Sequence, residues 1–118
     1  MQVKRCFRLT RSDDFKRVRR SGKSYAHPLV ILYALKSAQT SVRVGVSAGL
    51  AVGNAVKRNR AKRLLRAAMN DLLPWTALGS DLLLIARSPL PQSDLQHTRA
   101  ALSNLLSRAD LLIQNHDV

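Results

Sequence analysis

Residues 53–66 read GNAVKRNRAKRLLR, a segment that combines positive charge with the apolar spacing of a helix. From this segment onward, apolar side chains recur at steps of three and four residues until Pro74 stops the pattern. These side chains are Ala61, Leu64, Leu65, Ala68, Met69 and Leu72. The spacing predicts an amphipathic helix from about Ala55 to Leu73, with one face in the core and the charged face outside.

Two strands are predicted before this helix. Residues 29–35 (LVILYAL) form an apolar run of strand length, and Val42, Val44 and Val46 alternate with polar or small residues as a half-buried strand does. The alternation puts Arg43 on the face opposite the valines. A short polar connection separates the two runs, so an antiparallel hairpin is expected.

The remaining elements predict an α/β fold of one domain, residues 1–118. A first helix is expected from about Asp13 to Arg20, a further strand is possible at residues 24–28, a buried strand covers residues 81–86, and a closing helix presents an apolar face from Leu95 to Leu112. The order α-β-β-β-α-β-α is typical of an α/β (α+β) two-layer sandwich, with three helices on a small mixed sheet of about four strands.

Charge indicates the class of partner. The chain of 118 residues has 20 Lys and Arg against 7 acidic residues, all Asp, for a formal charge of +13. A polyanion relieves such self-repulsion, and nucleic acid is the commonest one. An acidic membrane surface is less suitable, because the longest apolar runs are only strand-sized. The charged N-terminus does not resemble a secretory signal, so a cytoplasmic protein without a membrane partner is expected.

Side-chain catalysis has little support in the sequence. Cys6 is the only cysteine, the three histidines are far apart, and no HExxH or Walker motif occurs. The sequence therefore predicts no catalytic residue, no protein-bound metal or other cofactor, and no small-molecule substrate.

The charge of the predicted basic helix has one sign only. Like charges at helical spacing weaken an isolated helix, and a face that is merely solvated is more often mixed in sign. The alternative of a solvated face stays open, but an excess of Arg favours bidentate phosphate contacts. Asn54 precedes the helix, whose free N–H groups could hold a further phosphate. Phe15 and Tyr33 could stack on unpaired bases, but core packing is the alternative for both and is the favoured interpretation for Tyr33.

The stretch VGNAVKRNRAKRLLR at residues 52–66 resembles the signature of the bacterial ribonuclease P protein component, whose Arg-Asn-Arg core would be Arg58–Arg60 here. LTRSDDFKRVRRSGKSY, VRVGVSAG and DLLLIARSPLP resemble other parts of that family, so the likeness covers nearly the whole chain. It implies the non-catalytic protein subunit of a ribonucleoprotein endoribonuclease that removes the 5′ leader of precursor tRNA. The catalytic RNA would hold the magnesium ions, and the fold would contain a left-handed βαβ crossover.

The resemblance also implies site residues. The positions matched to catalytic-RNA binding are Asn54, Lys57, Arg58, Asn59, Arg60, Lys62, Arg63 and Arg66. Those matched to a cleft for the single-stranded leader are Phe15, Lys16, Arg17, Tyr33 and Arg43. Four positions depart from the family pattern: Leu50 and Ala51 replace lysines, Ala67 replaces a glutamate, and Arg19 replaces a second aromatic residue.

Two other classes of function remain as alternatives. A structural RNA-binding protein, such as a ribosomal one, would show the same salt-sensitive binding without a preference for a leader. A DNA-binding regulator would place the basic helix in a major groove, but such a helix normally follows another short helix rather than a strand.

Overall fold

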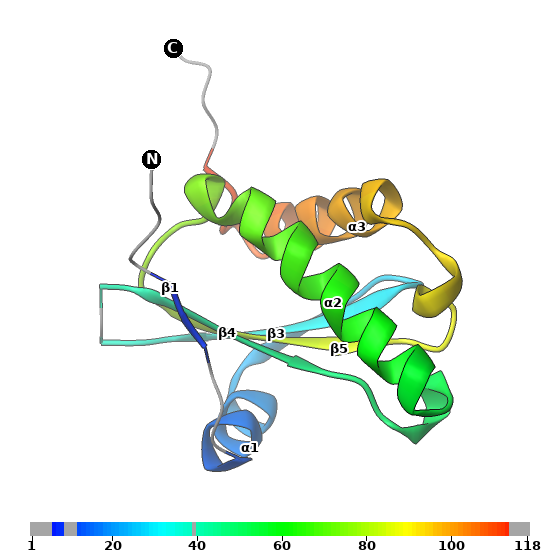
Figure 1. Cartoon of the computed structure of the whole chain (residues 1–118). Helices are drawn as coiled ribbons and strands as arrows, with labels where there is room; N and C mark the ends of the chain where they lie inside the picture. Colours follow the sequence, from blue (N-terminus) through cyan, green and yellow to red (C-terminus); the bar gives the residue numbers. More distant parts are fainter. Residues whose placement is uncertain (1–5, 9–11, 39, 114–118) are drawn as a thin grey trace.

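A mixed β-sheet of five strands lies at the centre of the molecule (Figure 1). The computed structural model describes residues 6–8, 12–38 and 40–113. The strands are β1 (Cys6–Arg8), β2 (Lys23–Ala26), β3 (Val30–Lys36), β4 (Val42–Ser47) and β5 (Ser80–Ala86). Their order in the sheet is β1-β4-β5-β3-β2. β1, β4 and β5 are parallel, whereas β3 is antiparallel to both β5 and β2.

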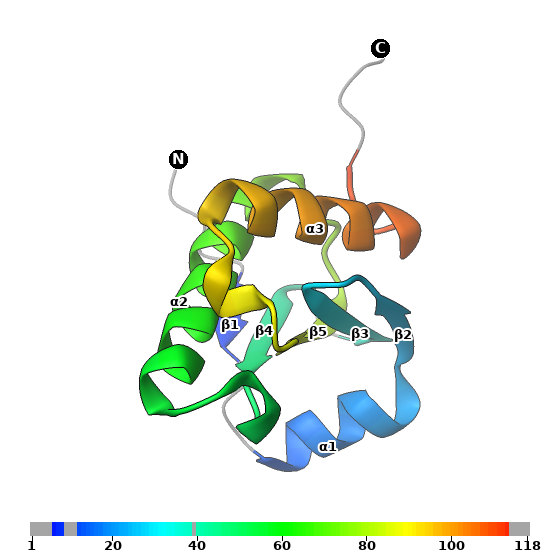
Figure 2. The ribbon, with the colours of Figure 1, turned by 90° about the vertical axis from the view of Figure 1, so that its right-hand side faces the viewer.

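Helices cover both faces of this sheet. They are α1 (Ser12–Ser21), α2 (Ala55–Leu72) and α3 (Leu95–Arg108), with the short 3-10 segments η1 (Leu50–Val52), η2 (Leu73–Trp75) and η3 (Leu90–Gln92). Figures 1 and 2 show α2 and α3 together on one face and α1 on the other. None of the described helices is long and apolar enough to cross a membrane.

The alternation of side chains along the strands divides the interior into two clusters. Val30, Leu32, Leu82 and Leu84 point toward α2 and α3, where they join the main core. The helical members of that core are Ala61, Leu65, Ala68 and Met69 of α2 and Leu102, Leu105 and Leu106 of α3. Each fully buried leucine contributes about 1.5–3 kcal/mol, so this face dominates stability.

A smaller cluster lies between α1 and the opposite face of the sheet. Val18 and Leu83 are buried there, and partly buried Phe15, Tyr33, Leu35 and Ile85 pack against them. Gly22 ends α1 where its N–H donates to the carbonyl oxygen of Val18, 2.8 Å away. A Cβ atom on Gly22 would lie 2.8 Å from the carbonyl oxygen of Ala34, so only glycine lets the chain pass this close to β3.

Local signals set both ends of α2. The Asn54 side chain accepts a hydrogen bond from the backbone N–H of Lys57, 3.0 Å away, and thereby caps the helix. Gly53 precedes it with a φ of 135°, a conformation that other residues rarely adopt. At the other end, α2 stops at Leu72, and Pro74 follows two residues later within η2. The prediction of a helix from Ala55 to Leu73 is therefore confirmed to within one residue.

The predicted α/β class, with three helices on a mixed sheet, is confirmed, but the predicted order omitted β1. This strand precedes α1 and pairs in parallel with β4, so the observed order is β-α-β-β-β-α-β-α with five strands rather than four. The two-layer description also needs correction, because α1 covers the face opposite α2 and α3. At three residues, β1 is too short to show an alternating pattern.

The predicted hairpin between residues 29–35 and the valine strand is wrong. β5 lies between β3 and β4. The last five residues of this strand are all apolar and require burial on both faces of the sheet, which a central position provides. The hairpin that does form joins β2 to β3, which confirms the possible strand near residues 24–28 but starts it one residue earlier. The connection from β4 through α2 to β5 joins parallel neighbours, and its left-handed sense stays a prediction.

The closing helix is shorter than predicted. It ends at Arg108 instead of continuing to Leu112, since Asp110 adopts a φ of 61° and breaks the helical path. Leu112 then pairs with Thr76 in an isolated antiparallel bridge. The predicted helix was too long because it rested on apolar spacing alone. Leu111 and Leu112 pack against the main core although they lie beyond the end of α3.

Candidate nucleic-acid interface

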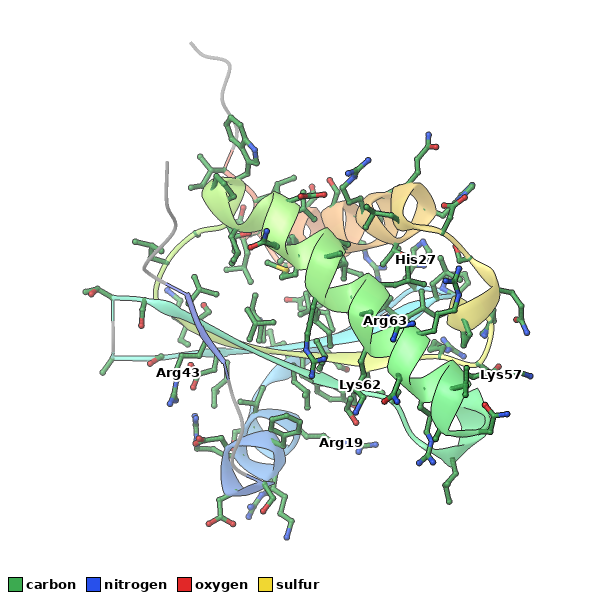
Figure 3. The ribbon with its side chains drawn as sticks, in the orientation of Figure 1. Arg19, His27, Arg43, Lys57, Lys62 and Arg63 are labelled. Carbon is green, nitrogen blue, oxygen red and sulfur yellow. The ribbon has the colours of Figure 1, made fainter. Side chains whose placement is uncertain are left out.

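The outer face of α2 is a row of exposed polar and cationic side chains. Asn59, Arg63 and Arg66 are exposed, whereas Ala61 and Leu65 on the inner face are fully buried. Figure 3 shows Lys57, Lys62 and Arg63 extending from this helix. The predicted division of α2 into a core face and a charged face is confirmed.

In the described part of the chain, no carboxylate neutralises this row. Among the described residues, no ion pair includes a lysine or arginine of α2. The positive charges are therefore available to an outside anion, which is the arrangement expected for phosphate contacts.

Arg60 has a second role within the fold. Its Nε–H donates to the carbonyl oxygen of Pro91 at 2.6 Å, and its Nη2 donates to the carbonyl oxygen of Ser93 at 3.0 Å. These bonds tie the first turns of α2 to η3. Arg58 differs again: its Nε atom is buried and has no hydrogen-bond partner among the described residues.

The segment that leads into α2 exposes both polar and apolar side chains. The side-chain oxygen of Asn54 is engaged as the helix cap, and Lys57 is exposed beside it. Leu50 is 82% exposed, and Val56 is 74% exposed. This tip of the molecule is therefore apolar as well as cationic.

A second group of arginines lies on the α1 side of the sheet. Arg43 of β4 is the register partner of Asp81 on β5 and contacts it twice, with Nε at 2.9 Å and Nη2 at 2.7 Å. Arg17 of α1 donates to the same carboxylate at 2.7 Å. Asp14 completes the group, 3.3 Å from Arg17 and 3.9 Å from Arg43.

Asp81 keeps its charge despite its position. Burial alone would raise the pKa of this carboxyl group, but the hydrogen bonds from Arg43 and Arg17 outweigh burial and hold its pKa below the usual value. The same contacts raise the pKa of both arginines. All three groups are therefore ionised at neutral pH.

The aromatic residues predicted to line the leader cleft are half-buried on the same side of the sheet as these arginines. Phe15 and Tyr33 both pack into the smaller cluster, so core packing accounts for part of each side chain. The guanidinium carbon of Arg19 lies 5.9 Å from the centre of the Tyr33 ring, within cation–π range. Lys16 is exposed on α1. Arg19 thus places a cation over the Tyr33 ring.

The predicted site residues form two groups on opposite faces of the sheet. One follows α2, and the other comprises Phe15, Lys16, Arg17, Tyr33 and Arg43 around α1, β3 and β4. In Figure 3, Arg43 lies on the α1 side of the sheet, whereas Lys62 and Arg63 extend from α2.

Sequence reasoning missed the acidic partners Asp14 and Asp81. One signal was present for Asp81: it is the only charged residue in the run SDLLLIA, and an acid at the start of a strand buried on both faces needs a cation. Arg43, which lies on the face of its strand opposite the valines, was the candidate cation for this acid. Nothing in the sequence indicated that Arg17 would contact the same carboxylate.

An arginine-rich helix whose cations pair with none of the described acids, exposed on a small α+β scaffold of charge +13, defines a protein built to bind a polyanion. A family model described as Ribonuclease P matches residues 3–110. The chain therefore belongs to the ribonuclease P protein family, whose members are protein components of the ribonuclease P endoribonuclease complex. The resemblance seen in residues 52–66 is confirmed.

Individual relatives agree with this assignment. The chain is 33% identical to the ribonuclease P protein component of Bacillus cereus over 112 residues, covering 94% of each chain. It is 37% identical to that of an Exiguobacterium species over 107 residues, covering 91% of this chain and 93% of the relative.

Solved structures give the same result for the fold. The RNase P protein of Staphylococcus aureus superimposes with a TM-score of 0.80 at 27% identity, covering 90% of this chain and 97% of that one. The RNase P protein of Thermotoga maritima gives a TM-score of 0.77 at 28% identity, covering 86% and 96%.

Proposed function

We propose that this chain binds the catalytic RNA of ribonuclease P through the outer face of α2, and that it contacts the 5′ leader of precursor tRNA through the α1 side of the sheet. The observation that carries the first half is the row of α2 cations without an ion-pair partner in the described part of the chain. Each phosphate that such a cation neutralises releases counterions and stabilises the complex.

The residues proposed for the catalytic RNA differ in what they can offer. Arg63 and Arg66 are exposed and present whole guanidinium groups, which suit bidentate phosphate contacts. Lys57 lies beside the N-terminal end of the helix, where a phosphate would also be favoured. Asn59 is exposed within the same row, Lys62 is half-buried beside it, and Arg58 has a buried Nε–H with no acceptor among the described residues. Asn54 contributes chiefly by capping α2, and Arg60 by holding it against η3.

The α1 side is proposed for the leader because it combines cations with half-buried rings. Phe15 and Tyr33 are only partly buried, so their rings can stack on unpaired bases, and Lys16 offers an exposed charge. Arg17 and Arg43 offer guanidinium groups held in fixed positions by Asp81. A single strand fits such a surface better than a duplex, because its bases are free to stack.

The chemistry of leader removal is assigned to the RNA. The described residues contain no group of three or more His, Cys, Asp or Glu that could hold a metal ion, so the donor set of that part of the chain does not fit a resident magnesium ion. Magnesium ions bound by the RNA would supply the hydrolytic chemistry. The protein would act in the cytoplasm, and its own part is to neutralise phosphates and position the leader.

The test is reconstitution. The purified chain is added to ribonuclease P RNA at low magnesium concentration, and cleavage of precursor tRNA is measured against RNA alone. A gain in cleavage is expected, because phosphate neutralisation replaces part of the cation requirement of the folded RNA. Binding without any gain in cleavage would instead indicate a general RNA-binding protein.

A further inference from the structure

Four charged side chains meet between α1 and the sheet, and the two acids among them are not equivalent. Asp81 is 1% exposed and makes three hydrogen bonds of 2.7–2.9 Å to Arg17 and Arg43. Asp14 is 22% exposed and lies 3.3 Å from Arg17 and 3.9 Å from Arg43. One acid is therefore a buried anchor, whereas the other is a loosely held neighbour at the surface.

The charges of this cluster do not balance without Asp14. Arg17 and Arg43 carry two positive charges, and Asp81 cancels one. The second negative charge comes from Asp14, which makes one long hydrogen bond and one contact beyond hydrogen-bond distance. Partly exposed pairs held by such long contacts contribute little to stability, so the Asp14 carboxylate can be exchanged for another anion at small cost.

The geometry leaves donors for such an anion. Arg43 uses Nε and Nη2 on Asp81, and Arg17 uses Nη2 on both acids. In the described part of the chain, Nη1 of each arginine makes no hydrogen bond. Two guanidinium groups fixed on a shared buried carboxylate, each with donors to spare, suit the tetrahedral oxygens of a phosphate group.

Asp14 can leave without disrupting the helix that carries it. It lies in the first turn of α1, where the N-terminal end of the helix dipole favours a negative charge whichever way the side chain points. The carboxylate can therefore turn toward solvent and keep that interaction.

We propose that Arg17 and Arg43 form a phosphate-binding site on the buried Asp81 carboxylate, and that Asp14 occupies this site in the free protein until a backbone phosphate of the leader displaces it. This inference rests on the proposed leader binding. Asp14 acts as an internal competitor, and Asp81 acts as a positioning residue. The two acids then have opposite effects: removing Asp14 strengthens leader binding, whereas removing Asp81 weakens it.

Asp14→Asn and Asp81→Asn test this difference in the complex assembled with ribonuclease P RNA. Affinity is measured for precursor tRNA with its leader and for mature tRNA. Asp14→Asn is expected to raise the affinity for the precursor about two- to fivefold and to leave that for mature tRNA unchanged. Asp81→Asn is expected to reduce the preference for the leader. A folded Asp81→Asn protein with an undiminished preference would overturn the role of Asp81.

The matched control is Asp13→Asn. Asp13 lies one residue away in the same helical turn, is exposed, and has no ion pair among the described residues. Its removal changes the net charge by the same amount. An equal gain in both variants would show a general charge effect, and a loss of precursor affinity in Asp14→Asn would show a purely structural role. Either result overturns the proposal.

A second measurement separates this site from leader binding as a whole. The Nε–H NMR signals of Arg17 and Arg43 are followed during titration of the free full-length chain with inorganic phosphate. They are expected to shift at lower phosphate concentration in Asp14→Asn than in the original chain. If the original complex shows no preference for the leader, the proposed leader binding fails. If the NMR signals respond identically in both proteins, the phosphate site fails.

Discussion

Arg60 and Pro91 are joined by a hydrogen bond of 2.6 Å between the guanidinium Nε–H and the backbone carbonyl oxygen, across 31 residues of sequence. The bond connects α2 to η3. It shows that the arginines of α2 are not one uniform set, because Arg60 is engaged with the fold and Arg63, one turn further along, is exposed.

This difference predicts that substitution of Arg60 lowers the stability of the fold, whereas substitution of Arg63 hardly changes it. Arg60→Ala removes hydrogen bonds to two carbonyl groups and should lower the free energy of unfolding by about 1–3 kcal/mol. Arg63→Ala removes only an exposed side chain and should change it by less than about 0.5 kcal/mol. Urea unfolding of both variants measures this, and equal stabilities would show that the Arg60 contacts contribute nothing.

Binding should show the complementary result. Arg63→Ala and Arg66→Ala should each weaken binding to the catalytic RNA and reduce the slope of log affinity against log salt by about one unit. Arg99→Ala on α3 is the control, since that arginine is already paired with Asp71 at 2.8 Å and its slope should not change. Affinity measured across a salt series decides the matter, and unchanged slopes in both α2 variants would mean that this face meets solvent only.

The aromatic contribution to leader binding is tested at Phe15. Phe15→Leu retains an apolar side chain in the smaller cluster but removes the ring, so precursor tRNA should lose about 1–3 kcal/mol of binding while mature tRNA is unaffected. Leu35→Val, in the same cluster, controls for altered packing. A similar loss with both tRNAs would contradict the assignment of Phe15 to the leader.

Acid should weaken the fold through Asp81. Because its folded pKa lies below its unfolded value of about 3.9, the stabilisation is fully present above that pH and disappears as the pH falls through the folded pKa. Asp81→Asn should therefore be less stable at neutral pH and should lose less stability on acidification. Unfolding curves from pH 7 downward, with Asp13→Asn as control, give this comparison; parallel curves for Asp81→Asn and the original chain would contradict it.

The sequence was sufficient to predict the elements with strong periodicity, but it did not predict which strands pair with one another in the sheet. The three- and four-residue spacing located α2 to within one residue, because a helix forms locally and its apolar stripe must meet the sheet. The position of β5 between β3 and β4 depends on long-range pairing, and no local pattern encodes that choice. The three residues of β1 carry no alternation to read.

The candidate site shows the same division. Exposure of Arg63 followed from helical geometry, whereas the engagement of Arg60 by η3 required knowledge of where a distant loop passes. The side of the sheet that carries Arg43 followed from alternation with the valines. Its meeting with Arg17 on one carboxylate depends on how α1 docks, and the apolar packing of Val18 and the close approach at Gly22 contribute to that docking.

The sheet separates the cations of α2 from the Arg17–Arg43 pair, and this separation has a consequence for how RNA is arranged around the protein. If α2 binds the catalytic RNA and Arg17 contacts the leader, as proposed, the two RNAs must approach the protein from different sides. The protein would then act as a spacer of fixed thickness. Once the first RNA is bound, the width of the fold would determine how far from it the leader can lie.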